Sequence, residues 1–389
     1  MHLKRYLAAA VTAALITSAA PALAAPDLSA PIELKTMGSF AFGGTVDNLP
    51  DGTTFHGDHG YAQYYVAAHS RHLPIVMWHG IGQSGKTYES TPDGREGFQA
   101  LLPREDWSVY IVDQPRRGRA GYTNAGKTAS EIPTVLSEAA VWEAFRNGPW
   151  TAGKKAELFE NSQFPLSPAA VEQFFRQQAP DTAEEPMTAE YRQFIGRTGA
   201  ALFDSIGDGI LITHSNSGQY GWEIAMESHG KVKAVIAFEP GACAFPENNP
   251  PEDFEIAQDL VAKALAPRLV SAERWERLLK LPILIIYGDN IADKPNAESF
   301  NAEVWRVSYK RAQQFAKAIN EAGGDAQVLH LPDLNIHGNT HAAFADKNNL
   351  QILDIVTDWL HFKGLDGYEG AHQGPVLPQP ADYTLPNNF

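Results

Sequence analysis

The segment 209–220 reads GILITHSNSGQY, and it decides the fold. It opens with a short apolar run at 209–212, which is typical of a buried strand, and its last residues begin a helical stretch. Between strand and helix lies Ser215, with Thr213 two residues before it and Ser217 two residues after it. A serine on a sharp strand-to-helix turn needs small neighbours at these two positions, because the backbone there is strained. The segment therefore predicts a turn that presents Ser215 at the end of a strand.

Further short apolar runs with the same character precede and follow this turn. They lie at 75–78, 108–112, 234–238, 282–287 and 326–330. Each is rich in Val and Ile and ends at polar or Gly residues, and helical stretches alternate with them. This alternation predicts a mostly parallel sheet flanked by helices, with polar residues gathered at the carboxyl ends of the strands.

The interval between the runs at 108–112 and 209–212 is too long for one crossover helix. A helix near 189–206 can make the crossover, so we interpret residues 123–186, approximately, as an inserted helical cap over the site. Residues 25–50 are weakly patterned and are interpreted as a lead-in. The tail after Lys363 is rich in Gly and Pro and is expected to lack regular structure.

The N-terminus has the features of an export signal. Lys4 and Arg5 form a positive region, residues 7–19 are apolar, and Ala22-Leu23-Ala24 matches a small-x-small cleavage site. The apolar stretch is shorter than the ~20 residues of a membrane span. We therefore expect a signal peptide at 1–24, a mature hydrolase domain at 25–389 without a membrane anchor, and a periplasmic or secreted protein.

The composition and net charge of the chain exclude several classes of binding partner. The chain has 389 residues, 44% hydrophobic and 20% charged, which suits one large globular domain. Its formal net charge is -15, and removing Lys4 and Arg5 with the signal makes it -17. Such a chain repels nucleic acid and anionic lipid, so neither is expected as a partner. The single cysteine, Cys243, excludes an internal disulfide and a Cys-rich metal site.

A serine hydroxyl is a poor nucleophile until a base takes its proton. Two histidines, His337 and His341, follow the last predicted strand, where a base can reach the turn at Ser215. We prefer His341 because it directly precedes an apolar pair at the start of a helical stretch, whereas His337 can shape the loop.

The base in turn needs a carboxylate to fix its tautomer. Glu239 ends the run 234–238, and Asp289 and Asp293 follow the run 282–287. Either location preserves the chain order Ser, acid, His. Glu239 is favoured by its place at the end of an apolar strand, where an unpaired carboxylate is costly, but Asp293 remains an alternative.

The oxyanion of an acyl-transfer intermediate needs backbone N–H donors. One is expected from Asn216, which follows the nucleophile, and one from the loop after the run 75–78. In that loop Ile81 is the favoured donor and Gly82 the alternative. Residues 80–87 also match the spacing of a phosphate-binding loop, but that pattern leaves Ser215 and His341 unexplained and suits an intracellular NTPase rather than an exported chain.

Several motifs together resemble those of one known group, the secreted bacterial carboxylesterases of the α/β-hydrolase superfamily that use a Ser–Glu–His triad with the Glu after strand six. The matching pieces, in chain order, are His79-Gly80, Thr91-Pro92-Asp93-Gly94-Arg95, Asp113-Gln114, Arg117-Gly118-Arg119, His214-Ser215-Asn216-Ser217-Gly218, Glu239-Pro240-Gly241, His337-Gly338-Asn339-Thr340-His341 and Asp346-Lys347-Asn348-Asn349-Leu350.

The resemblance implies the α/β-hydrolase fold with Ser215 as nucleophile, Glu239 as acid and His341 as base. It places the oxyanion donors at Ile81 and Asn216. The cap region matches least, so the resemblance does not carry over a substrate.

These features predict a serine esterase that cleaves a small-molecule carboxylic ester through an acyl-enzyme on Ser215, with no cofactor and no metal. The alternatives are a lactonase or other chemistry of the same fold, such as a peptidase or lyase, and a non-catalytic ligand-binding homologue. The sequence does not determine the acyl-chain preference or the oligomeric state.

Overall fold

The computed structural model describes residues 27–121, 129–151, 153, 156–183 and 185–377. The expected signal peptide at 1–24 lies outside the described residues. Also outside are residues 25–26, the gaps at 122–128, 152, 154–155 and 184 in or next to the expected cap, and residues 378–389.

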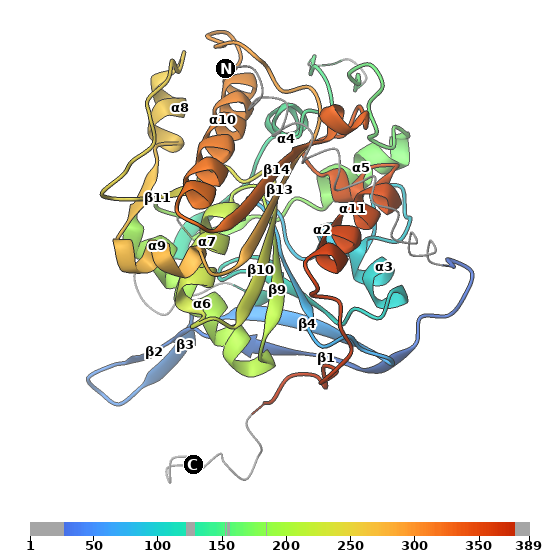
Figure 1. Ribbon diagram of the computed structural model, residues 1–389, viewed down its shortest axis with the longest axis vertical. Helices are drawn as coiled ribbons and strands as arrows, with labels where there is room; N and C mark the ends of the chain where they lie inside the picture. The colour runs from blue at the N-terminus through green and yellow to red at the C-terminus, as the bar shows by residue number, and fades with distance from the viewer. Residues whose placement is uncertain (1–26, 122–128, 152, 154–155, 184, 378–389) are drawn as a thin grey trace.

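An eight-stranded sheet forms the centre of the molecule (Figure 1). In spatial order its strands are β1 (Leu34–Phe42), β4 (Gly60–Ala67), β6 (Val109–Asp113), β5 (Ile75–Trp78), β9 (Gly209–His214), β10 (Val232–Phe238), β13 (Pro282–Tyr287) and β14 (Asp325–His330). The strands from β6 to β14 are parallel, whereas β1 and β4 are antiparallel to their neighbours. The six strands predicted from the apolar runs are confirmed.

The interpretation of residues 25–50 as a lead-in is wrong. This region contains β1, which pairs with β4 at the edge of the sheet, and β2 (Thr45–Asn48), which forms a hairpin with β3 (Thr54–Gly57). An edge strand is only partly buried, and the apolar alternation of β1 is weakened by Gly38 on its inward face and by the exposed Met37 on the other. Its pairing with β4 stabilises it, and that contact is not visible in the local sequence.

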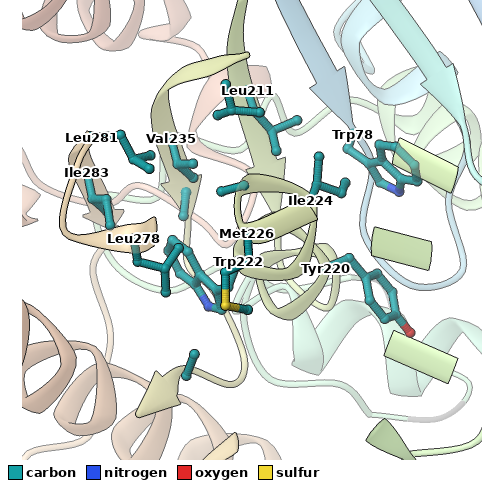
Figure 2. Packing of buried hydrophobic residues seen from close by; sticks show 14 of the residues in the cluster. Trp78, Leu211, Tyr220, Trp222, Ile224, Met226, Val235, Leu278, Leu281 and Ile283 are labelled. Carbon is teal, nitrogen blue, oxygen red and sulfur yellow. The ribbon is translucent and has the colours of Figure 1, made fainter. Parts of the chain in front are cut away.

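Helices cover both faces of the sheet (Figure 1). The helices that contribute to the core on one face are α6 (Ala189–Ile206), α7 (Ser217–Glu227), α9 (Ala272–Leu278) and α10 (Phe300–Glu321). Those that contribute to the core on the other face are α2 (Lys86–Glu89), α3 (Phe98–Arg104), α4 (Glu138–Ala144), α5 (Pro168–Arg176) and α11 (Asn349–Phe362). Figure 2 shows how Trp222 and Met226 of α7 lie in the first core together with Val235, Leu278 and Ile283.

Short elements complete the chain. They are β7 (Ala129–Thr134) paired with β8 (Asp181–Ala183), β11 (Ala244–Pro246) paired with β12 (Arg268–Val270), the helix α8 (Asp259–Ala264), and the 3-10 turns η1 (Gly118–Ala120), η2 (Leu331–Leu334) and η3 (Ala343–Ala345). No helix of the described residues combines the length and apolar character needed to cross a bilayer.

The helix starts follow directly from local sequence. The side chains of Ser137, Thr188 and Ser299 each accept a hydrogen bond from a backbone N–H in the first turn of α4, α6 and α10. Such N-caps satisfy donors that would otherwise have no partner. The predicted crossover helix near 189–206 is therefore formed as α6, directly before β9.

The segment between β6 and α6, where a cap was expected at 123–186, carries α4, α5 and the strands β7 and β8 in its described part. Its interior is aromatic: the Trp142 ring lies 5.2 Å from Phe164 and 6.1 Å from Phe174. These rings belong to the core on the α11 face of the sheet. The inserted segment is thus packed onto the sheet as part of the same domain.

Candidate active site

Ser215 lies on the turn between β9 and α7. Its backbone has φ +59°, a left-handed conformation that a serine rarely adopts and that persists only where the surroundings enforce it. The Ser215 N–H donates to Phe238 O at 2.9 Å, and its carbonyl accepts from the N–H groups of Gly218 and Gly241. These bonds hold the strained turn against the end of β10.

The flanking positions of this turn carry Thr213 and Ser217 in place of the two glycines of the usual motif, and glycines elsewhere supply the space. A Cβ on Gly80 would lie 2.9 Å from Ser215 Cβ, and one on Gly221 would lie 2.7 Å from Thr213 Cγ2. The Ser217 hydroxyl accepts from His214 N at 3.0 Å and lies 3.0 Å from Trp78 O, to which it can donate. Ser217 therefore ties the turn to the end of β5.

Glu239 follows β10 and is 1% exposed. Its Oε2 lies 2.5 Å from His341 Nδ1, and because a carboxylate only accepts, Nδ1 is the donor. The Gly288 N–H donates to Oε1 at 2.7 Å, and the Arg146 guanidinium donates to both oxygens. Burial raises the pKa of Glu239, but the Arg146 charge and the bond to His341 outweigh it and hold that pKa well below its ordinary value. Glu239 is therefore ionised.

His341 lies in the loop between η2 and η3 and is 2% exposed. Its ring lies between aromatic neighbours, 4.0 Å from the Trp305 ring and 5.1 Å from that of Phe145. Burial is the main influence and lowers the pKa of His341, although Glu239 opposes it. The ring is consequently neutral near pH 7, and with Nδ1 protonated its Nε2 can accept a proton.

Ser215 and His341 are brought together at the same end of the sheet. His214, the residue before the serine, stacks 4.4 Å from the His341 ring, and its Nε2 lies 3.0 Å from His341 O. Among the hydrogen bonds of the described residues, none joins the Ser215 hydroxyl to the His341 ring. Bonds of this kind often tighten only when substrate is present.

The alternative acid and base lie elsewhere. Asp293 is exposed on the loop after β13. His337 is 51% exposed at its side chain, and its Nδ1 lies 3.5 Å from Asp289 Oδ2. Asp289 also accepts from Gly338 N at 2.8 Å. His337 and Asp289 thus shape the loop that carries His341.

The loop after β5 passes directly beside Ser215, through Gly80. Among the hydrogen bonds of the described residues, none is donated by the backbone N–H of Ile81, Gly82 or Asn216. Gly82 has φ +66°, and its carbonyl accepts from Ala179 N at 2.8 Å. The two expected donors, Ile81 and Asn216, and the alternative Gly82 all remain candidates for binding the oxyanion.

Buried polar groups hold this loop in place. His79 Nδ1 lies 2.8 Å from Gly80 O, and Gln114 N donates to His79 Nε2 at 3.2 Å. Asp113 accepts from Gly85 N at 2.5 Å and from Arg119 N at 2.7 Å. Because Gly85 N donates to the Asp113 carboxylate, this N–H is not available to a phosphate group, and the negative charge beside it would repel one.

Three contacting residues were missed from the sequence: Phe145, Arg146 and Trp305. No motif marks them, since they approach Glu239 and His341 only through the packing of α4 and α10. Among the described residues, no group of three or more His, Cys, Asp or Glu side chains is arranged to hold a metal ion.

Comparisons with known proteins agree with this architecture. No family model matches the sequence. The chain is 26% identical to a protein described as "Probable secreted lipase phiG" from a fungal species (strain ATCC 74256), over 77% of this chain and 85% of that protein. It is 27% identical to the protein of "The Atomic Resolution Structure of a Novel Bacterial Esterase", with a TM-score of 0.67 over 86% of this chain and 98% of that one. The chain has the α/β-hydrolase fold.

Proposed function

We propose that the chain is a serine hydrolase that cleaves carboxylic esters through an acyl-enzyme on Ser215. The observation that carries the proposal is the strained Ser215 turn at the end of β9, next to a buried His341–Glu239 pair. The similarity to proteins described as a lipase and an esterase supports ester hydrolysis as the reaction class.

In the proposed mechanism, His341 Nε2 takes the proton from Ser215 Oγ as the oxygen attacks the ester carbonyl. The carbonyl oxygen becomes an oxyanion and is stabilised by the N–H groups of Ile81 and Asn216. His341 then gives its proton to the departing alcohol, which leaves an acyl group on Ser215. Water, deprotonated by His341, attacks that group and releases the acid and the free serine. Glu239 keeps the His341 tautomer and stabilises the imidazolium.

The proposed substrate is a small-molecule ester, and the proposed location is the periplasm or the medium after removal of residues 1–24. The name of the secreted relative supports export. Secretion is tested by fractionating cells that express the full chain and determining the N-terminus of the mature protein. An N-terminus at Met1 in the cytoplasmic fraction would contradict it.

The function is tested with nitrophenyl esters of increasing acyl length, a lactone and an anilide, together with a fluorophosphonate probe followed by peptide mapping. We expect ester turnover, a probe adduct on Ser215, and loss of both in Ser215→Ala. His341→Ala and His337→Ala form a matched pair, of which only the first should lose activity. A preference for lactone or anilide would change the reaction class, and an unlabelled, inactive chain would favour a ligand-binding protein.

A further inference from the structure

Arg146 lies in the inserted segment, two residues after the end of α4, yet it contacts the candidate catalytic acid. Its side chain is 4% exposed. Nη1 donates to Glu239 Oε2 at 2.7 Å, Nη2 donates to Oε1, and Nε donates to Asp289 O at 2.9 Å. A bidentate guanidinium fixes the plane of a carboxylate as well as its charge.

The backbone around Arg146 is also fixed against the site. His341 N donates to Phe145 O at 2.9 Å, and Trp305 Nε1 donates to Ala144 O at 2.7 Å. Arg146 itself has φ +51°, a conformation that the surrounding contacts must enforce. The residues 144–146 therefore contact the acid, the base and the ring that stacks on the base.

A second part of the inserted segment holds the loop that carries His341. Gln163 N donates to Gly338 O at 2.7 Å, and Lys347 N donates to Gln163 O at 2.8 Å. A Cβ on Gly338 would lie 1.8 Å from Asn161 O, so the approach is as close as a glycine permits. The inserted segment thus contacts this loop at Gly338 and Lys347, on both sides of His341.

We propose that Arg146 is a positioning residue, which fixes the Glu239 carboxylate against His341 and thereby makes docking of the inserted segment a condition for activating Ser215. This inference rests on the proposed function. It goes beyond that function because it makes a segment outside the Ser–Glu–His set part of the active site.

The charge of Arg146 predicts the direction in which the pH dependence of activity should shift when this residue is replaced. Removing the positive charge of Arg146 favours uptake of a proton by the Glu239–His341 pair, whichever partner binds it. The other ionisable groups around the pair are His214 on β9, Tyr287 on β13, Asp289 after β13 and Asp346 before α11. Of these, Tyr287 also feels the Arg146 charge, but losing that charge raises its already raised pKa further, so Tyr287 stays neutral through the acidic limb. The acidic limb of the pH profile should therefore move to higher pH.

The test compares Arg146→Met and Arg146→Lys with Arg104→Met. Arg104 makes a bidentate pair with Glu96 through a side chain that is 8% exposed, so the same substitution breaks a similar pair outside the site. In Arg146→Met we expect kcat to fall about 100-fold with KM nearly unchanged, and the limb to rise by about one to two pH units. Arg146→Lys should keep the limb near the wild-type position but lose about tenfold in kcat, because an ammonium cannot bind both oxygens in plane.

Arg104→Met should alter neither kcat nor the limb. The inference is overturned if folded Arg146→Met retains wild-type kcat, or if its kcat falls while the limb does not move. Arg146→Lys provides the test should Arg146→Met fail to fold, since wild-type kcat in that variant would also overturn the inference. An NMR titration compares the pKa of His341 in the wild type and in Arg146→Met, and an unmoved pKa refutes the positioning by Arg146. Failure of the proposed function is seen separately, as a wild type that neither turns over esters nor reacts with the fluorophosphonate probe.

Discussion

Substituting Glu239 by Gln is the sharpest perturbation of the site. The carboxylate accepts from four donors: His341 Nδ1 and one Arg146 nitrogen on Oε2, and Gly288 N and the second Arg146 nitrogen on Oε1. A Gln amide has only one oxygen, so its NH₂ group must face two of these donors. At the Oε1 position it would oppose Arg146 and Gly288, neither of which can become an acceptor.

At the Oε2 position the conflict is partly relieved, because His341 can switch tautomer and accept at Nδ1. The proton then lies on Nε2, and the ring can no longer take a proton from Ser215. A wrong tautomer at such a pair costs about 10⁴-fold in kcat in the serine proteases, equivalent to about 5.4 kcal/mol of transition-state stabilisation. Arg146 also loses its buried counter-charge, which should lower the free energy of unfolding by about 3–5 kcal/mol.

The measurement is kcat and KM on a short nitrophenyl ester, with folding checked by circular dichroism and urea denaturation. Asp293→Asn is the control, since it tests the exposed alternative acid by the same change of chemistry. We expect Glu239→Gln to lose about 10⁴-fold in kcat and Asp293→Asn to lose less than twofold. A folded Glu239→Gln variant within tenfold of wild type, or a larger loss in Asp293→Asn, would refute the reasoning.

The pH profile and the packing of the turn give two further predictions. Because burial lowers the pKa of His341, the acidic limb of kcat/KM should have its midpoint below about 6.5, the ordinary value for histidine; a midpoint above 7 would contradict a buried neutral base. Gly218→Ala should lower the free energy of unfolding by about 1–3 kcal/mol, since the new Cβ would lie 2.4 Å from Pro240 Cβ. Urea denaturation measures this loss, and Gly367→Ala, where the new Cβ meets nothing within 4 Å, is the matched control; equal stability of the two variants would show that the turn tolerates the contact.

Local patterns predicted the six strands from β6 to β14 and the crossover helix. The runs at 75–78 and 209–212, and the helix at 189–206, appear in the structure almost residue for residue. A buried parallel strand must be apolar along its whole length, so it can be recognised from a short run of consecutive residues. The turn at Ser215 is marked locally by its small neighbours Thr213 and Ser217, although bonds to the end of β10 and the close approach of Gly80 hold it in the structure.

The sequence by itself thus determined a parallel α/β sheet with Ser215 at a strand end and two candidate bases in one loop. Only the tertiary structure decided that Glu239 pairs with His341, and that Arg146 from the inserted segment binds Glu239. The antiparallel edge strand β1 was likewise decided by its pairing with β4. These contacts join residues far apart in the chain, and such contacts form because the sheet and its helices bring their ends together. A pattern within a short stretch of sequence cannot predict which of these distant residues will be in contact.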